Sequence, residues 1–281
     1  MQARALPYLL LLPATIFLAV FFVYPFLQVA VEAFTGDLGF TLEHFETMAG
    51  HWKFSSAFWN TLLLAAVVVP TQMVMALYMA SIVNKMSSGR DFILYIWTIP
   101  LGISDLAAGL IWLAILEQNG FLNSFFFAFG LVEQPTTFLG YQNKGFLLLA
   151  VALAEIWRAT AIVLVILVAG MGLIPKEYAE AAEVFGANPW QRFLKVTLPL
   201  LRPSLQTALI LRTILAFEVF AVVAALAGTN FPVLMGETYQ WQFMLQDRKV
   251  AAAFALVILG ISVAFTIFFL WALRVPKEAR T

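Results

Sequence analysis

The stretch between residues 175 and 203 carries the most regularly spaced polar residues of the sequence. Glu180-Ala181-Ala182 is followed after three residues by Gly186, and Leu198-Pro199 closes the stretch. Apolar side chains recur around the two alanines at helical spacing, glutamates line the rest of this helix, and Gly186 can end it in a left-handed turn. An Asn-Pro pair can then start a second short helix. We interpret this acid-edged, small-residue helix pair as a docking element; the alternative is a solvated connecting loop.

A second set of chemically informative residues lies in otherwise apolar runs. Its members are all charged: Asp105, Glu155, Arg158, Arg212 and Glu218. A charge at the centre of a membrane helix costs roughly 2.5–3.5 kcal/mol, so each one must face a partner or a water-filled path. Glu155 and Arg158 are three residues apart and can pair on one helix face. Arg212 and Glu218 point in different directions, so we expect them to pair with other helices or with a second subunit.

Two hypotheses for these charges stay open: some of them line a solute path, or they are ion pairs that lock helices together. For Asp105 and Glu155, nearer the ends of their runs, an interfacial position is a third. The aromatic neighbours Trp157, Phe217 and Phe220 are candidates for stacking on the faces of a sugar. The charges at 155, 158, 212 and 218 sum to zero, which favours a neutral, hydroxyl-rich solute over an anion.

Several kinds of chemistry are excluded by composition. The chain has no cysteine, which excludes thiol catalysis and disulfides, and its two histidines, His44 and His51, are too few for an expected metal site. It contains no Gly-x-x-x-x-Gly-Lys-Ser/Thr phosphate loop, so ATP hydrolysis by this chain is not expected. No catalytic constellation supports an intramembrane enzyme. A formal net charge of zero argues against a nucleic-acid partner.

The composition also indicates which elements hold these residues. Of 281 residues, 62% are hydrophobic and 11% are charged, against about 25% charged in a soluble domain. Lipid is the natural solvent for such a chain, so we predict an all-α membrane protein with a single transmembrane domain over residues 1–281. Six transmembrane helices are expected at about residues 6–31, 58–84, 92–116, 145–174, 204–228 and 250–273. The docking stretch, 175–203, connects the fourth helix to the fifth.

The basic residues orient these helices. Six spans place both termini on one side, and ten of the sixteen Lys and Arg residues lie in the termini and connections of that side. Four lie in the opposite loops, and Arg158 and Arg212 lie inside spans. By the positive-inside rule both termini and the docking stretch are cytoplasmic.

The spacing of the docking stretch resembles the EAA motif of the permease subunits of binding-protein-dependent ABC importers. That motif is Glu-Ala-Ala, three residues, Gly, nine residues, an aliphatic residue, any residue and Leu-Pro. Its positions are held here by Glu180, Ala181, Ala182, Gly186, Val196, Leu198 and Pro199. Asn60-Thr61-Leu62, Trp157-Arg158 and residues 211–220 look like the sugar-permease branch, the maltose and glycerol-phosphate type. The turn at residues 227–230 departs from the Thr-Gly-Gly-Pro-like pattern of that branch.

The resemblance implies that the docking stretch holds the coupling helix, which sits in a cleft of a cytoplasmic ATPase. Glu180 would pair with a basic group there, Ala181 and Ala182 would permit close approach, and Gly186 would set the turn. The implied partners are an ABC ATPase dimer that binds ATP and Mg, a second homologous permease forming a heterodimer, an extracytoplasmic solute-binding protein, and membrane lipid. The implied location is a bacterial or archaeal plasma membrane. The chain itself would bind no cofactor and would not be an enzyme.

The leading hypothesis is therefore a permease that imports a sugar, an oligosaccharide or a sugar-like solute by alternating access. One alternative is a permease of the same kind for a polyamine, an anion or a sugar phosphate. Another is an ion-coupled secondary transporter, which would need broken helices or an inverted repeat around a midplane site; the sequence shows neither clearly. A membrane scaffold without transport would not need five intramembrane charges.

Overall fold

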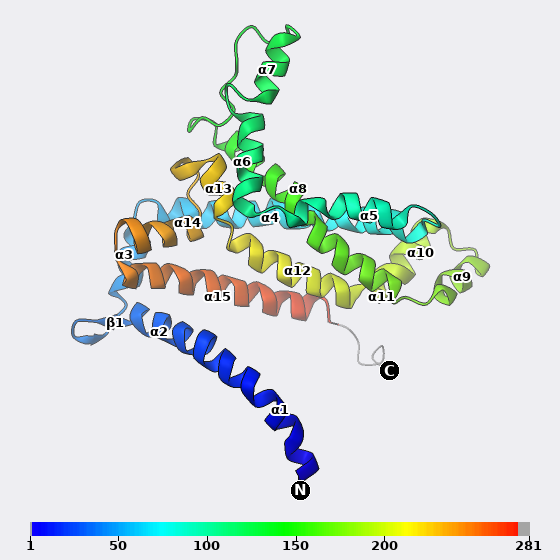
Figure 1. Cartoon of the computed structure of the whole chain (residues 1–281), viewed down its shortest axis with the longest axis horizontal. Coiled ribbons are helices and arrows are strands. Elements are labelled where there is room, and N and C mark those ends of the chain that lie inside the picture. Colours follow the sequence, from blue (N-terminus) through cyan, green and yellow to red (C-terminus); the bar gives the residue numbers. More distant parts are fainter. Residues whose placement is uncertain (1, 275–281) are drawn as a thin grey trace.

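The computed structural model describes residues 2–274, with side chains described for residues 9–274, and it is mainly helical (Figure 1). Within the described residues four helices are long and apolar enough to cross a membrane. The first joins α1 (Gln2–Leu18), a π-helical turn (Ala19–Val23) and α2 (Tyr24–Ala33); the others are α4 (Phe54–Lys85), α8 (Lys144–Gly172) and α15 (Arg248–Ala272). Helices suit these apolar runs because hydrocarbon offers the backbone no hydrogen-bond partner.

Two further helix pairs are apolar enough to span but are sharply bent. α5 (Arg90–Thr98), with a 3-10 extension (Ile99–Gly102), meets α6 (Asp105–Leu116) and α7 (Phe121–Ala128) at 96°. α10 (Pro189–Arg192), a π-helical turn (Phe193–Thr197) and α11 (Leu198–Leu200) meet α12 (Arg202–Phe217) at 70°. The described residues thus hold four candidate spans, or up to six if each bent pair is one span. The predicted all-α membrane class is confirmed, and the predicted six helices are the upper end of this range.

The bend before α6 falls where the sequence cannot continue a helix. Pro100 has no amide hydrogen to donate, and Ile103 and Ser104 are extended, with ψ of 130° and 155°. Ser104 then caps the next helix, because its Oγ accepts a hydrogen bond from the Ala107 N–H at 3.2 Å. Asp105 is consequently the first residue of α6.

A second interruption is not visible in the sequence. The helix expected over 204–228 ends at Phe217, and α13 (Ala221–Leu226) begins after Phe220, whose φ is −141°. No Gly or Pro lies between residues 204 and 226, so no local signal marks the break. A 3-10 turn (Gly228–Asn230), α14 (Leu234–Tyr239) and a π-helical turn (Gln240–Met244) then lead to α15.

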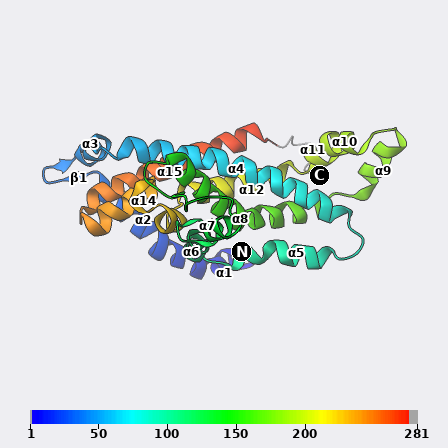
Figure 2. The same ribbon diagram turned by 90° about the horizontal axis from the view of Figure 1, so that it is seen from above.

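The centre of the bundle is formed by α4 and α8, which pack along each other, with α12 and α15 beside them (Figures 1 and 2). Small side chains such as Ala76, Ala154 and Ala208 are fully buried at these contacts. Small residues let helix backbones approach closely, which is how helices associate when lipid is as apolar as their side chains.

The two helices that follow the breaks pack against each other. A Cβ added to Gly109 of α6 would lie 2.6 Å from Ala225 Cβ and 3.2 Å from Val222 Cα, both on α13. Glycine is therefore required at this crossing for its lack of a side chain. α6 and α13 form a unit that leaves the direction of the long helices, and α6 stands away from them in Figure 1.

The connecting elements gather at the two ends of the bundle (Figure 1). α9 (Lys176–Val184) and α10 lie at one end, near the turn between α4 and α5. At the other end lie α14, α3 (Glu43–Gly50) and a short hairpin. The hairpin strands are β1 (Thr35–Gly36) and β2 (Gly39–Phe40), in which Thr35 pairs with Phe40.

Replacing Gly109 by Ala should destabilise the protein by about 1–3 kcal/mol, because the added methyl overlaps α13. Gly260→Ala is a matched control inside α15, where nothing lies within 4 Å of the added carbon. It should be neutral or stabilise by about 0.5–1 kcal/mol. Thermal unfolding of the detergent-solubilised protein measures both effects, and equal midpoints for the two variants would contradict close packing at Gly109.

Candidate functional site

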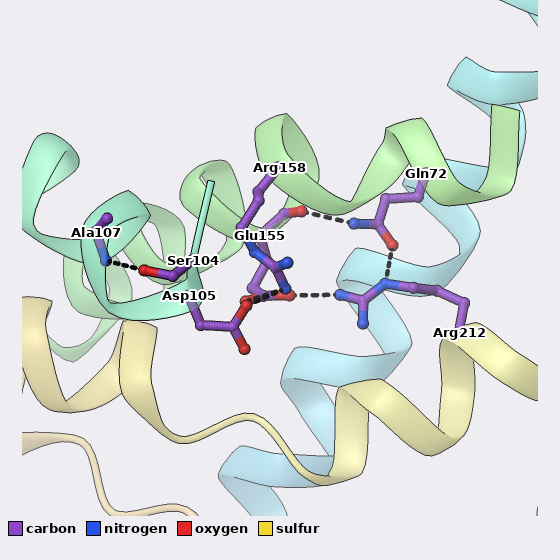
Figure 3. A network of polar contacts seen from close by, with 7 residues as sticks. All are labelled: Gln72, Ser104, Asp105, Ala107, Glu155, Arg158 and Arg212. Carbon is purple, nitrogen blue, oxygen red and sulfur yellow. Dashed lines mark hydrogen bonds and ion pairs between the residues drawn. The ribbon is translucent and has the colours of Figure 1, made fainter. Parts of the chain in front are cut away.

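A buried ion pair connects α8 and α12 near the middle of the bundle. Arg212 Nη2 lies 2.6 Å from Glu155 Oε2 (Figure 3). Arg212 is 1% exposed and Glu155 is 2% exposed, so water does not screen the pair. Glu155 therefore faces the interior of the bundle. The prediction that Arg212 finds its partner on another helix is confirmed.

A fully buried glutamine of α4, Gln72, completes this pair. Its Nε2 donates a hydrogen bond to the backbone carbonyl of Glu155 at 2.7 Å, and its Oε1 accepts one from Arg212 Nε. Gln72 thus ties a third helix to the pair and positions the guanidinium (Figure 3). The sequence analysis missed Gln72, although it lies in a long run without charges, where an amide is costly unless it is bonded.

A second ion pair continues the first toward the bend before α6. Arg158 Nη2 lies 2.8 Å from Asp105 Oδ1 and 3.8 Å from Glu155 Oε1. The predicted pairing of Glu155 with Arg158 is thus present, but each of the two has a nearer partner. The side chain of Asp105 is 50% exposed, unlike the sealed pair behind it. The five residues Gln72, Arg212, Glu155, Arg158 and Asp105, here called the polar chain, run from the core to an exposed end.

The polar chain balances its own charge. Two arginines face two carboxylates, which offsets the desolvation that makes an unpaired buried charge so costly. Glu155 Oε1 and Arg158 Nε are buried without a hydrogen-bond partner among the described residues. These free positions lie on the side of the polar chain that leads to Asp105. The inner end is closed by direct hydrogen bonds, and the outer end keeps unused capacity.

The other predicted path residues lie apart from the polar chain. Glu218 is exposed in the break after α12, and Trp157 is partly exposed beside Trp112. Phe220 stacks on Tyr239. Phe217 is 2% exposed and packs edge-on against Phe265, so its ring belongs to the core.

The docking stretch has the local conformation that its residues predict. α9 is followed by Gly186 with φ +79°, the left-handed value that favours glycine. Asn188 caps α10, with its side chain accepting from the Gln191 N–H at 2.8 Å and Gln191 bonding back to the Asn188 N–H. An Arg192–Glu183 ion pair links the two short helices. Glu180 and Ala181 are exposed, and Ala182 is half-buried.

The docking stretch ends in a corner. Pro199 lies inside α11, directly after Leu198, and does not end the helix. The chain turns at Leu201 instead, before Pro203 in the first turn of α12. Proline is tolerated in the first turn of a helix, because the amide hydrogen that it lacks would have no partner there. Leu198 and Pro199 are half-buried at this corner.

Comparison with known proteins gives a consistent result. A family model described as binding-protein-dependent transport system inner membrane component matches residues 72–277. The sulfoquinovosyl glycerol transport system permease protein SmoG of Agrobacterium fabrum is 30% identical, over 96% of this chain and 91% of the relative. The trehalose/maltose transport system permease protein MalF of Thermococcus litoralis is 29% identical, over 97% of this chain and 95% of the relative.

A solved structure shares the fold. It is a bacterial alginate ABC transporter in complex with an alginate pentasaccharide-bound periplasmic protein. One of its chains superposes with a TM-score of 0.83 at 22% identity, over 97% of this chain and 95% of that chain. The arrangement of helices is thus similar over nearly the full length to a chain of a transporter.

Replacing Glu155 by Leu should destabilise the protein by about 3–5 kcal/mol, because Arg212 is left buried without its counter-charge. Adding Arg212→Met should recover most of that loss, since no unpaired charge remains at the pair. Glu183→Leu, which removes an ion pair at an exposed site, should cost about 0–1 kcal/mol. Thermal unfolding in detergent orders these variants; a double variant no more stable than Glu155→Leu would refute this explanation.

Proposed function

Because the chain belongs to the family of binding-protein-dependent transport system inner membrane components, we propose that it is the permease subunit of an ATP-driven importer for a sugar or sugar-like solute. The observation that carries the proposal is the docking stretch, which exposes Glu180 on a short helix at one end of a bundle of apolar helices (Figure 1). The chain is not an enzyme. A separate subunit binds ATP with Mg and hydrolyses the ATP.

The docking stretch acts as the coupling element in this proposal. Glu180 offers a carboxylate to a basic group of the ATPase, and Ala181 and Ala182 keep the approach open. Gly186 at the turn and Asn188, which caps α10, orient the two short helices. The exposed aromatic rings of Phe185 and Trp190 supply apolar surface for burial in the partner.

The proposed assembly contains two permeases, two ATPases and an extracytoplasmic solute-binding protein, within lipid. The fold shared with a transporter solved with its periplasmic protein supports the last of these partners. The broad apolar surface of the helix over Leu9–Ala33 is suited to lipid or to a second permease. In this proposal each bent pair is one span, which gives six spans. The distribution of Lys and Arg along the sequence supports cytoplasmic termini and a cytoplasmic docking stretch.

The solute path runs past the exposed end of the polar chain. Arg158 and Asp105 lie there, and Trp157 is on the same helix as Arg158. Glu218 and Phe220 flank the break after α12. Arg212 and Glu155 are buried behind these residues and stabilise the helices that line the path. Phe217 packs in the core. This divides the charged residues into solute contacts and structural supports.

A carbohydrate is the solute class that suits this path. Exposed aromatic rings and paired charges favour hydroxyl-rich molecules, because hydroxyl groups bond to carboxylates and guanidinium groups alike. The relatives named above transport sulfoquinovosyl glycerol and trehalose or maltose, and the solved neighbour transports alginate. An ion-coupled secondary transporter remains the alternative mechanism for a bundle with broken helices, but it leaves the docking stretch unused.

Transport would proceed by alternating access. ATP binding draws the two ATPases together, and each docking stretch follows its ATPase. α12 begins at the end of that stretch, contains Arg212, and ends at the break that holds Glu218. A displacement at one end of the bundle therefore reaches the path through a single rigid helix and through the ion pair that joins it to α8.

Glu180→Lys should abolish ATP-dependent uptake and co-purification of the ATPase, because it places like charges at the docking contact, while membrane insertion stays intact. Glu133→Lys, the same reversal at an exposed site between α7 and α8, is the control and should leave the ATPase bound. Solute-stimulated ATP hydrolysis at the wild-type level in Glu180→Lys would overturn the coupling role.

Glu218→Ala should raise the KM for uptake by about tenfold, the effect of losing one charge-assisted hydrogen bond, without releasing the ATPase. The measurement is uptake of labelled maltose, trehalose and sn-glycerol 3-phosphate by vesicles that contain the complete transporter. Uptake of the phosphate alone would favour an anionic solute. An unchanged KM for every solute carried would show that Glu218 has no contact with it.

A further inference from the structure

Two hydrogen bonds hold the short helix α14 against α4, at the end of the bundle away from the docking stretch. Asn60 Nδ2 donates a hydrogen bond to the Pro232 carbonyl at 2.9 Å, and the Leu234 N–H donates one to Thr61 Oγ1 at 3.0 Å. Thr61 is fully buried, so the second bond is shielded from water. These two contacts fix the turn before α14, and with it the side chains that α14 presents on each side.

One side of α14 carries a buried carboxylate that is not hydrogen-bonded to its neighbours Lys53 and His51. Glu237 is 4% exposed, and Lys53 Nζ and His51 Nδ1 each lie 3.9 Å from one of its oxygens, beyond hydrogen-bond distance. His51 Nδ1 and Trp241 Nε1 are buried and have no hydrogen-bond partner among the described residues. Buried polar groups are nearly always bonded, so this cluster has unused hydrogen-bonding capacity.

The charge of Glu237 does not stabilise the fold. Burial raises the pKa of Glu237, an effect that Lys53 and His51 only partly offset. For an acid with a raised pKa the protonated form suits the fold better, and that stability is lost as the pH rises through the raised pKa. Above that pH the carboxylate costs stability.

A cavity of about 180 Å³ lies between α14 and α13. The rings of Phe220 and Tyr239 stack in its lining, with centroids 4.9 Å apart and planes at 28°. Three residues with polar side chains, Thr229, Glu237 and Gln240, also line it. A mainly apolar and aromatic lining with a few polar groups is the usual composition of a small-molecule site.

We propose that this cavity is a subsite for one sugar residue of the solute. Phe220, the first lining residue in the sequence, lies two residues after Glu218. The proposal rests on the proposed function, which supplies the carbohydrate class. The volume equals about six water molecules at roughly 30 Å³ each, which suits one six-membered sugar ring. One C–H face of such a ring packs on a free outer face of the Phe220–Tyr239 stack, and its hydroxyls bond to Glu237 and Gln240.

Other ligand classes fit this lining less well. An anion would find no Lys, Arg or His side chain in the lining. A purely apolar ligand would leave the polar side chains without partners. No group of three or more His, Asp or Glu side chains suited to a metal ion occurs in the described part of the chain. A neutral, hydroxylated ring satisfies both the aromatic and the polar parts of the lining.

The absence of cysteine makes the subsite directly testable. Thr229→Cys and Gln240→Cys each place one thiol in the lining of the cavity. Gln242→Cys places one two residues further on, outside that lining. Each variant is studied as the complete transporter in vesicles, with N-ethylmaleimide modification followed by mass on this subunit. Glucose, maltose or trehalose at ten times its dissociation constant should slow modification at 229 and 240 about tenfold and leave 242 unchanged.

Two variants at Tyr239 separate stacking from folding. In the Gln240→Cys background, Tyr239→Leu should abolish protection by sugar, because the aromatic wall is lost, while the thiol still reacts at its sugar-free rate. Tyr239→Phe keeps the ring and should keep the protection. Protection that survives Tyr239→Leu would overturn the subsite.

Uptake of the same labelled sugars, measured in parallel, separates the two proposals. Uptake without protection at 229 and 240 overturns the subsite and leaves the proposed function standing. Equal protection at all three positions also overturns the subsite, because it reports a change of the whole transporter. Absence of both uptake and protection for all three sugars overturns both proposals.

Discussion

The contact on which the rest of the structure depends is the buried pair of Arg212 and Glu155. Neither charge tolerates the bilayer alone, so α8 and α12 must stay together wherever the bundle moves. Gln72 adds α4 to this pair through two hydrogen bonds, and Arg158 extends it to Asp105 at the start of α6. One continuous set of polar contacts therefore connects four elements, α4, α8, α12 and α6. Any rearrangement during transport must keep these charges paired or replace their partners.

The broken helices are the second constraint on the structure. A break inside a span frees backbone groups, which is tolerated only where protein or water satisfies them. Ser104 caps the helix after one break, and the helices after both breaks pack on each other through Gly109. Asp105 is the first residue after one break, and Glu218 lies in the other. In the proposed function this is where a polar solute meets carboxylates inside an apolar bundle.

The two ends of the bundle present different surfaces, and α12 runs from one end toward the other. The docking stretch exposes Glu180, small residues and aromatic rings to a partner protein. The opposite end holds α14, pinned by Asn60 and Thr61 of α4. α12 starts at the first end, is held midway by Glu155, and stops short of the second. This geometry suits a device in which ATP binding at one end alters access at the other.

The sequence by itself determined the features that depend on local composition and period. The apolar runs required a helical membrane protein, and the spacing of residues 175–203 predicted the left-handed turn at Gly186 and the cap at Asn188, both of which the structure contains. Only the tertiary structure decided which charges meet. Arg212 binds Glu155 and Gln72 across three helices, Arg158 prefers Asp105 to its helix neighbour, and a helix without Gly or Pro ends at Phe217. These outcomes depend on residues far apart in the chain, whose distances in space no local pattern encodes.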